Sequence, residues 1–409
     1  MRKKDYSLAE AAMKSEDYAA AAPCQAPAGA HARFRRLRLT DFRSYARADI
    51  ALDGRPVVLI GANGAGKTNV LEAVSLLGPG RGLRGSRLDE LPRVEGGGGW
   101  AVAAQIESAG DERHIGVGAT AADPSRRLCR IDEASASGPA AFADVVRFMW
   151  LTPAQDRLFM DGPGERRRFL DRIAVALNPD QARAGADYEL AMRQRQRLLD
   201  ERSRDDAWIS ALETQMAEAG VAIAAARREA AGALVAAEID AAAGFPAAEI
   251  ALEGMLEAGL ASAPAAEVEE EFLTSLRRHR AADAAAGRAL VGPHRSDLIV
   301  THRQKGRPAR LCSTGEQKAL LIGLVLAAAR SLALQGRFRG GAPAPLVLLL
   351  DEIAAHLDEG RRAALFDILG ALGFQVFMTG TDKSLFSAWG SRAQAFAVEG
   401  GSLNETTVR

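Results

Sequence analysis

Lysine is scarce in this chain of 409 residues, which takes nearly all of its positive charge from arginine. Between Lys14 and Lys305 the only lysine is Lys67. The planar fork of arginine and the compact, rotatable ammonium of lysine are not equivalent. A single lysine within so long a stretch therefore indicates a position where an ammonium group is needed.

Other absences limit the class of protein. The three cysteines, Cys24, Cys129 and Cys312, lack paired or metal-ligand spacing, which is typical of a reducing compartment. No run of 18 apolar residues exists, so no segment is expected to span a membrane, and a cytoplasmic location is expected. Because Lys+Arg and Asp+Glu both number 52, the net charge of zero disfavours a protein that coats nucleic acid through bulk charge.

Contact with DNA would have to come from local basic patches. Four candidates are Arg33 with Arg35, Arg36, Arg38 and Arg43, then residues 166–168, 277–280 and 303–310. Each patch taken alone is more typical of a solvated face than of a DNA contact.

Lys67 lies in a segment that fits a phosphate-binding loop. Gly61-Ala62-Asn63-Gly64-Ala65-Gly66-Lys67-Thr68 matches G-x-x-x-x-G-K-[ST]. In that pattern backbone N–H groups surround the phosphates, the lysine reaches the β- and γ-phosphates, and the hydroxyl holds Mg²⁺. The apolar residues 56–60 predict a preceding strand. The segment from Asn69, which is itself expected to contact ATP, predicts a helix whose positive N-terminus faces the phosphates.

A second part of the site is expected near residue 350. Leu346–Leu350 is a continuous apolar run, typical of a parallel strand covered on both faces. Asp351 and Glu352 follow at its carboxyl end, where ligands of open α/β sheets bind. We expect Asp351 to support Mg²⁺, and Glu352 to orient or deprotonate the attacking water.

The segment Ser313-Thr314-Gly315-Glu316-Gln317 predicts the start of a helix, with Ser313 as its N-cap and Glu316 as the capping-box partner. Taken alone, the segment is an ordinary capped amphipathic helix. However, the segment follows the phosphate loop and precedes Asp351 in the chain. In this order the three elements form a set of motifs typical of ATP-binding-cassette ATPases.

The rest of the chain predicts two kinds of structure. Alternation over residues 34–52 predicts paired strands, and residues 100–131, with turn signals at 96–99 and 110–111, predict further short strands. A helical region is expected from about Gln181, with heptad-like spacing of Ile209, Leu212, Met216 and Ile223. A helix of about 50 residues reaches only about 75 Å, so this insert can be a short arm but not the coiled-coil bridge of a tethering protein.

Several stretches resemble the RecF family of bacterial recombination mediators, relatives of the SMC-type ATPases. Besides the nucleotide motifs, the resemblance is carried by residues 39–45, 151–153, 165–172, 292–298 and 356–358. Gly292-Pro-His-Arg and Arg166-Arg-Arg-Phe-Leu-Asp are its most family-specific parts.

The resemblance implies an ATP-dependent DNA-binding protein whose two copies sandwich ATP, with Ser313, Gly315 and Gln317 acting on the nucleotide of the partner. It implies binding to gapped DNA at single-strand/double-strand junctions, loading of RecA with the partners RecR and RecO, and a weak, DNA-stimulated ATPase that resets the dimer. Thr381 would contact the γ-phosphate in place of a switch histidine. Gln155 lies near the place of a sensor glutamine and fits a surface-loop residue equally well.

The expected fold is α/β. It is an ABC-type P-loop ATPase head, with a mixed sheet, flanking helices and an antiparallel β subdomain, and it carries an inserted helical arm. The expected ranges are a disordered extension at 1–32, a first lobe at 33–178, the helical arm at 179–288 and the C-terminal part of the ATPase at 289–409. The alternatives are the ATPase subunit of a transporter and another SMC-like ATPase, which the missing switch histidine and the short insert disfavour.

Overall fold

The computed structural model describes residues 32–108, 111–201, 205–237, 244–334 and 346–408. The predicted disordered extension, apart from its last residue, lies outside these ranges. The described residues form two compact units. Unit 1 contains those up to Gln155, Gly244 and those from Leu332, and unit 2 contains the remainder between Asp156 and Ser331.

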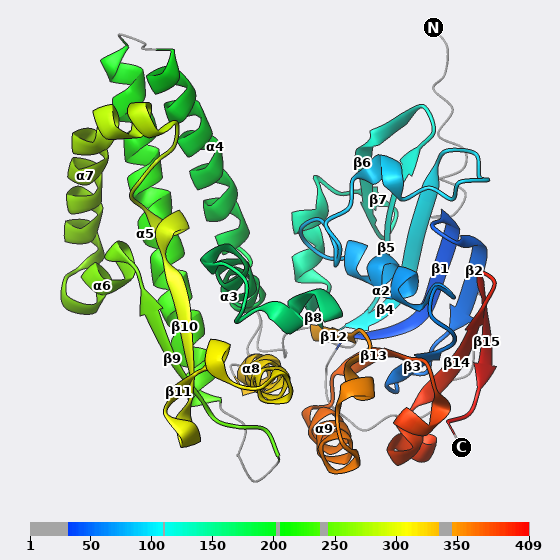
Figure 1. Cartoon of the computed structure of the whole chain (residues 1–409). Helices are drawn as coiled ribbons and strands as arrows, with labels where there is room; N and C mark the ends of the chain where they lie inside the picture. Colours follow the sequence, from blue (N-terminus) through cyan, green and yellow to red (C-terminus); the bar gives the residue numbers. More distant parts are fainter. Residues whose placement is uncertain (1–31, 109–110, 202–204, 238–243, 335–345, 409) are drawn as a thin grey trace, which may run out of the picture. The chain divides into compact units, whose positions relative to one another are not determined.

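Unit 1 contains a six-stranded mixed sheet in the order β15-β14-β3-β13-β12-β8 (Figure 1). Its strands are β3 (Val57–Ile60), β8 (Arg147–Leu151), β12 (Leu346–Leu350), β13 (Gln375–Gly380), β14 (Gln394–Glu399) and β15 (Ser402–Thr406). Neighbouring strands are parallel except for β14 and β15. All residues of β3, β12 and β13 are buried, as expected for parallel strands covered on both faces. The two strands predicted beside the nucleotide motifs are therefore confirmed.

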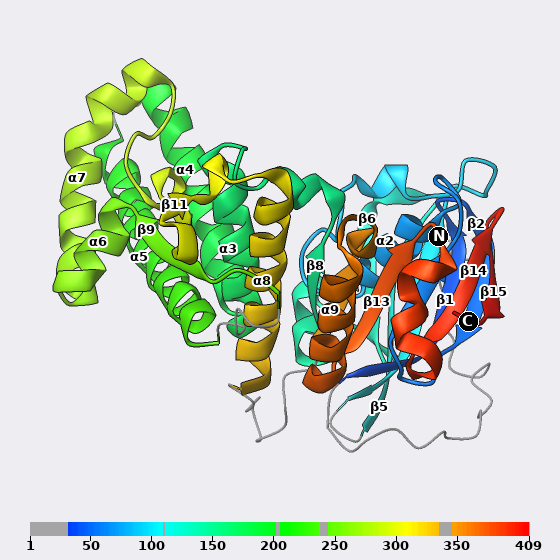
Figure 2. The ribbon, with the colours of Figure 1, turned by 60° about the horizontal axis from the view of Figure 1, so that its bottom comes forward.

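A second, antiparallel sheet of unit 1 has the order β2-β1-β4-β5-β6-β7. It contains β1 (Arg33–Phe42), β2 (Tyr45–Ala51), β4 (Trp100–Ser108), β5 (Asp111–Thr120), β6 (Asp123–Ile131) and β7 (Ala134–Ser135). The predicted paired strands are thus confirmed. The Phe34 ring meets the Phe377 ring edge-on at 5.6 Å, so the two sheets share one core. Figure 2 shows β15 beside β2.

Helices connect these strands. They are α2 (Lys67–Leu76) and α9 (Glu359–Leu372), with 3-10 turns η2 (Leu88–Glu90), η3 (Pro139–Asp144), η4 (Pro153–Arg157), η9 (Ile353–His356) and η10 (Lys383–Arg392). α9 begins at the cap Asp358, whose carboxylate accepts from the backbone N–H of Arg361 at 2.8 Å. It ends at Gly373 in the left-handed conformation.

Unit 2 is mainly helical. Its helices are α3 (Pro163–Leu177), α4 (Gln181–Asp200), α5 (Asp206–Ala236), α6 (Met255–Ser262), α7 (Ala265–Ala286) and α8 (Thr314–Leu334, whose last turn belongs to unit 1). α4 and α7 both pack against α5 and also contact each other. Ile209, Leu212 and Met216 are buried as their spacing predicts, and Ile223 is partly buried against the same cluster. At about 1.5 Å per residue, the 31 residues of α5 span only about 46 Å.

Unit 2 also contains an antiparallel sheet that the sequence did not lead us to expect. Its order is β11-β10-β9, from β9 (Ala248–Glu253), β10 (Asp297–His302) and β11 (Arg307–Pro308). Short turns η6 (Pro293–Arg295), η7 (Arg303–Lys305) and η8 (Ala309–Leu311) border it.

The compact units divide the chain near residue 155, since α3 packs on α5 and β10 of unit 2. The ranges 33–178, 179–288 and 289–409 stay predictions. Among the described residues, no helix is long and apolar enough to cross a membrane.

Candidate nucleotide-binding site

The phosphate loop connects β3 to α2 in unit 1. Ala62, Asn63 and Gly64 are exposed, whereas Gly66 and Lys67 are buried. Gly66 has φ +106°, and a Cβ atom on it would lie 2.8 Å from Oγ of Ser44. The phenol of Tyr45 donates to the Gly66 carbonyl at 3.0 Å. Only glycine satisfies both the backbone conformation and this close approach.

The side chain of Lys67 bonds back to the first residues of its own loop. Its side chain is only 4% exposed, and Nζ donates to the carbonyls of Gly61 at 2.8 Å and Ala62 at 2.9 Å. The ammonium therefore lies inside the curve of the loop, at the N-terminus of α2, where an anion is favoured. A phosphate bound there would meet a positive charge that already has a fixed position.

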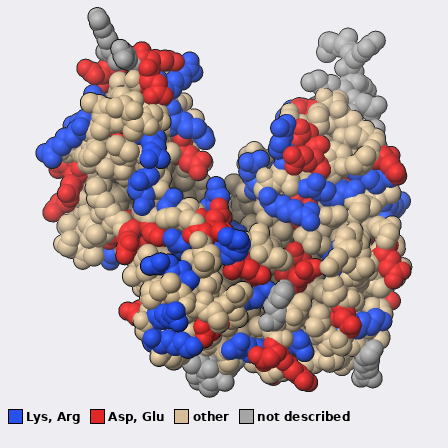
Figure 3. Space-filling view, viewed as in Figure 1, with Lys and Arg blue, Asp and Glu red and all other residues tan. Residues whose placement is uncertain are grey.

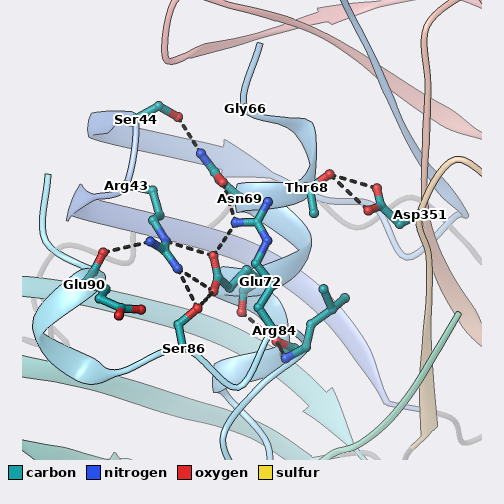
Figure 4. A network of polar contacts seen from close by, with 12 residues as sticks. Arg43, Ser44, Gly66, Thr68, Asn69, Glu72, Arg84, Ser86, Glu90 and Asp351 are labelled. Atoms are coloured by element: carbon teal, nitrogen blue, oxygen red, sulfur yellow. Dashed lines mark hydrogen bonds and ion pairs between the residues drawn. The ribbon is translucent and has the colours of Figure 1, made fainter. Parts of the chain in front are cut away.

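Thr68 and Asp351 come together from distant parts of the chain (Figure 4). Oγ1 of Thr68 donates to the two carboxylate oxygens of Asp351, at 3.0 and 3.1 Å. Asp351 is 7% exposed and directly follows β12. Its backbone N–H donates to the Leu151 carbonyl of β8 at 2.8 Å, which holds this end of β12 against β8. A hydroxyl beside a carboxylate is a set of oxygen donors that suits Mg²⁺.

Thr379 on β13 connects the two acidic residues, although no sequence motif points to it. Its buried hydroxyl donates to Oδ1 of Asp351 at 2.7 Å and accepts from the backbone N–H of Glu352 at 2.8 Å. The one feature that could have drawn attention to Thr379 is its place near the carboxyl end of a predicted strand, which lies next to β12. Hydroxyl groups at strand ends are common, however, and only the strand order shows which of them meets Asp351.

Glu352 adopts a left-handed backbone conformation, with φ +53°. This conformation is uncommon for a residue other than glycine, and it often marks a functional position. The bond from its N–H to Thr379 helps to hold this turn, in which η9 begins directly after β12.

A buried carboxylate organises the start of α2 (Figure 4). Glu72 is 1% exposed and accepts from the guanidinium groups of Arg43 and Arg84 and from the hydroxyl of Ser86. Arg84 also donates to Oδ1 of Asn69 at 2.9 Å, while Nδ2 of Asn69 donates to Ser44 at 3.0 Å. The predicted site residue Asn69 is thus fixed by contacts on both sides of its amide.

The two remaining predicted residues of unit 1 have different surroundings. Oε1 of Gln155 accepts from the N–H of Thr152 at 3.1 Å, whereas its Nε2 is buried with no hydrogen-bond partner among the described residues. Thr381 is exposed and directly follows β13. Their roles at the nucleotide stay predictions.

The predicted signature segment belongs to unit 2. α8 begins at Thr314, and the N–H of Ser313 donates to the carboxylate of Glu316 at 2.9 Å, which is half of the predicted capping box. Ser313, Thr314 and Gly315 are exposed. The hydrogen bonds from Lys305 and Ser313 lower the pKa of Glu316 to about 2.

Gln317 faces inward and not toward solvent. It is 7% exposed, and Nε2 donates to the Cys312 carbonyl at 2.9 Å and to the sulfur of Met160 at 3.6 Å. A contact with a nucleotide would require this amide to give up its present partners. Its role at the nucleotide stays a prediction.

The four lysines of the described residues are associated with the elements that carry the nucleotide motifs. Lys67 closes the phosphate loop. Lys305 pairs with Glu316, and buried Lys318 pairs with Asp156 at 2.9 Å, so both hold the start of α8. Lys383, two residues after Thr381, is exposed and donates to Thr406.

Many arginines of the first two predicted basic patches are paired with carboxylates of the same unit. In the first patch, Arg35 pairs with Glu107, Arg36 and Arg38 pair with Asp49, and Arg43 pairs with Glu72. Burial alone would raise the pKa of Asp49, but the two arginines outweigh it and lower that pKa. In the second patch, Arg166 pairs with Asp297 and Arg168 with Glu165. Figure 3 shows basic and acidic side chains close together over both units.

The comparisons with known proteins agree with this geometry. Residues 33–403 match the model of the RecF/RecN/SMC N terminal domain. The DNA replication and repair protein RecF of Rhizobium rhizogenes is 51% identical over 374 residues, which cover 91% of this chain and 98% of that protein. The RecF protein of Brucella abortus is 50% identical, with 90% of this chain and 95% of that protein covered.

Solved structures show the same fold. A structure of the recombination mediator protein RecF with ATP, in the RecFOR pathway, has a TM-score of 0.77 at 22% identity and covers 93% of this chain and 99% of its own. An SMC head bound to the C-terminal winged-helix domain of ScpA has a TM-score of 0.51 at 14% identity, covering 92% of this chain and 97% of its own. The chain therefore belongs to the RecF/RecN/SMC family of ATPases, and within it to the RecF proteins.

Proposed function

We propose that this protein is an ATP-driven DNA-binding switch of recombinational repair and replication-fork maintenance. The observation that carries the proposal is the convergence of Lys67, Thr68, Asp351 and Glu352 in one unit, in a chain about half identical to RecF proteins along most of its length. ATP binding would join two copies, the dimer would bind gapped DNA at single-strand/double-strand junctions, and slow hydrolysis would separate the copies.

The residues of unit 1 would divide the chemistry among them. The N–H groups of residues 61–68 and the ammonium of Lys67 would bind the phosphates. Thr68 and Asp351 would hold Mg²⁺, which supplies charge neutralisation at the phosphates when it is bound. Glu352 would orient and deprotonate the attacking water, and its strained turn would fix the carboxylate at the end of β12. Gln155 and Thr381 are proposed to lie close to the γ-phosphate.

The exposed start of α8 would complete the site of a second copy. Ser313 and Gly315 present the N-terminal end of a 21-residue helix, where backbone N–H groups favour an anion. The pair of buried Lys318 and partly exposed Asp156 would keep that end rigid. Gln317, also proposed to act in trans, would have to turn outward. By similarity to the relatives, RecR and RecO would be partners and RecA loading the outcome, in the cytoplasm near DNA.

The first test is a Glu352→Gln variant with ATP, Mg²⁺ and a labelled gapped duplex. Because this change keeps the size of the side chain but removes the base, we expect a dimer that persists at least tenfold longer than that of the unmodified protein. Molecular mass and DNA binding would be followed together, with ADP as the control nucleotide. Prompt return of the variant to monomers after ATP addition would contradict the role of Glu352.

A Lys67→Ala variant separates binding from turnover. It should fail to bind ATP tightly, and it should neither dimerise nor bind the gapped duplex under the same conditions. A protein that stays monomeric and ignores DNA with either nucleotide would exclude the proposed function as a whole.

A further inference from the structure

Unit 1 contains a cavity whose lining includes none of the residues proposed to act on ATP. It has a volume of about 510 Å³ and is lined by Leu76, Gly80, Arg81, Ser86, Arg87, Leu88, Asp89, Ser125, Arg127 and Pro139. These residues come from the end of α2, the segment that follows it, β6 and the start of η3. Its volume falls within the range of small-molecule sites, roughly 300–1,000 Å³.

The walls of the cavity combine two kinds of chemistry. Leu76, Leu88 and Pro139 supply apolar surface. Arg81, Arg87, Arg127 and Asp89 supply charge. Asp89 forms an ion pair with Arg87 at 2.8 Å, so its negative charge is balanced within the cavity wall. The cavity therefore has an excess of positive charge beside an apolar surface.

Arg127 carries much of that excess. Nη1 donates to the carbonyl of Gly80, and Nη2 donates to those of Leu76 and Gly78, so the side chain holds the segment after α2 against β6. The described residues give Arg127 no carboxylate partner, and its Nε is buried without an acceptor. Burial lowers the pKa of this guanidinium. A half-buried guanidinium without a carboxylate partner favours an anion beside it.

We propose that this cavity binds one nucleotide unit of a DNA strand, with the base against the apolar wall and the phosphate at Arg81 and Arg127. The inference rests on the proposed DNA-binding function and extends it to a site. A deoxynucleotide combines a flat base, whose faces are apolar, with an anionic phosphate, which matches the two kinds of wall. Because most other arginines of the first two basic patches are already paired, this cavity is a more suitable contact than those patches.

The test compares two exposed arginines that are close in the chain to the cavity. Arg81 lines it, whereas Arg126, next to Arg127 on β6, is not among its lining residues. Arg81→Glu and Arg126→Glu change the net charge equally. A third variant, Ser125→Glu, places a carboxylate in the cavity at an exposed position whose hydroxyl bonds only locally, to Asp123. Each variant would be measured with ATP for dimerisation and for binding to a gapped duplex over a range of salt concentrations.

We expect Arg81→Glu and Ser125→Glu to weaken DNA binding about tenfold or more, and Arg126→Glu less than about threefold. Loss of a phosphate contact should also reduce the salt slope by about one for Arg81→Glu. ATP-dependent dimerisation should stay intact in all three. A 4-thiothymidine in the gap should cross-link to residues 76–89 or 125–139 of the unmodified protein.

Other outcomes would overturn the site. Equal weakening by Arg81→Glu and Arg126→Glu would show an effect of bulk charge, and unchanged binding by Arg81→Glu and Ser125→Glu would remove the cavity from the interface. Cross-linking of free 4-thiothymidine monophosphate without cross-linking of the strand would exclude DNA as the ligand. An unmodified protein that dimerises with ATP yet binds no DNA would instead reject the proposed function, and the site with it.

Discussion

Single hydroxyl groups matter at the carboxyl end of the core strands. Thr379 contacts both the carboxylate of Asp351 and the backbone of Glu352, so one buried side chain positions the proposed metal ligand and the proposed base together. The motif around Asp351 was visible in the sequence because its residues are consecutive. Thr379 was not, because its importance depends on β13 lying beside β12.

A Thr379→Val variant should distinguish the hydrogen bonds of the Thr379 hydroxyl from the packing of its side chain. Valine keeps the shape but leaves Asp351 and the Glu352 N–H without the hydroxyl, a loss of about 1–3 kcal/mol in the free energy of unfolding. We expect single-turnover ATP hydrolysis to fall about tenfold while ATP binding changes less. Thr379→Ser, which keeps the hydroxyl, should retain most of the rate, and equal rates for the two variants would refute the role.

His294 in the Gly-Pro-His-Arg motif gives unit 2 a pH dependence. Its Nδ1 meets the Tyr188 hydroxyl at 2.8 Å, and Nε2 meets the Ala289 carbonyl at 3.0 Å. Burial lowers its pKa below the ordinary value, and the charges of Arg295 and Arg167 add to this, against a smaller opposite effect of the Ala289 bond and Asp283. The folded protein therefore binds a proton less readily than the unfolded chain.

Stability should consequently fall as the pH drops below about 6.5, the unfolded pKa, and the loss should level off below the folded pKa. The measurement is the urea midpoint between pH 8 and pH 5, compared with His294→Gln, which cannot titrate but can still donate to Ala289. The difference between the two proteins should change in this window. A constant difference across it would show that His294 titrates as in the unfolded chain.

The helices of unit 2 are joined by charge as well as by apolar packing. Arg195 on α4 is 1% exposed, and it donates to Glu213 on α5 at 3.0 Å and to Asp283 on α7 at 2.7 Å. A buried ion network is weak evidence for stability in itself, but removing one member leaves charges buried and unpaired. The three helices are therefore expected to tolerate changes at this junction poorly.

Arg195→Met should lower the free energy of unfolding by about 3–5 kcal/mol. Arg193→Met on the same helix is the matched control, because the Arg193 side chain is 67% exposed and its pair with Glu189 is a surface pair worth under about 1 kcal/mol. Both would be measured by chemical denaturation. A loss at Arg195 no larger than that at Arg193 would show that the network is dispensable.

The elements also show what a sequence can and cannot predict. The strands beside the nucleotide motifs and the start of α4 at Gln181 followed from apolar runs and helix periodicity. β9 did not, although its residues alternate between partly buried and exposed. Six residues between helical segments give too short a pattern, and its partner β10 begins more than forty positions later. Inward-facing Gln317 was equally hidden, since its contact with Met160 joins remote segments.

Across the whole molecule, the proposed chemistry is divided between two units. Unit 1 carries the phosphate loop, Asp351 and Glu352, and unit 2 carries the exposed start of α8. The net charge of zero has a local counterpart, because many arginines lie beside carboxylates of the same unit. Recognition of a polyanion by such a protein has to rely on a few unneutralised positions and not on its overall field.

The scarcity of lysine makes this protein suited to chemical footprinting. Outside residues 1–31, an amine-reactive reagent can acylate only Lys67, Lys305, Lys318 and Lys383, and two of these, Lys67 and Lys318, are buried. Peptide mass spectrometry after a brief pulse would thus report on the elements of the nucleotide motifs with almost no background from the rest of the described chain. If ATP joins two copies at the start of α8, acylation of Lys305 should decrease when ATP is added. This change could be measured without any engineered label.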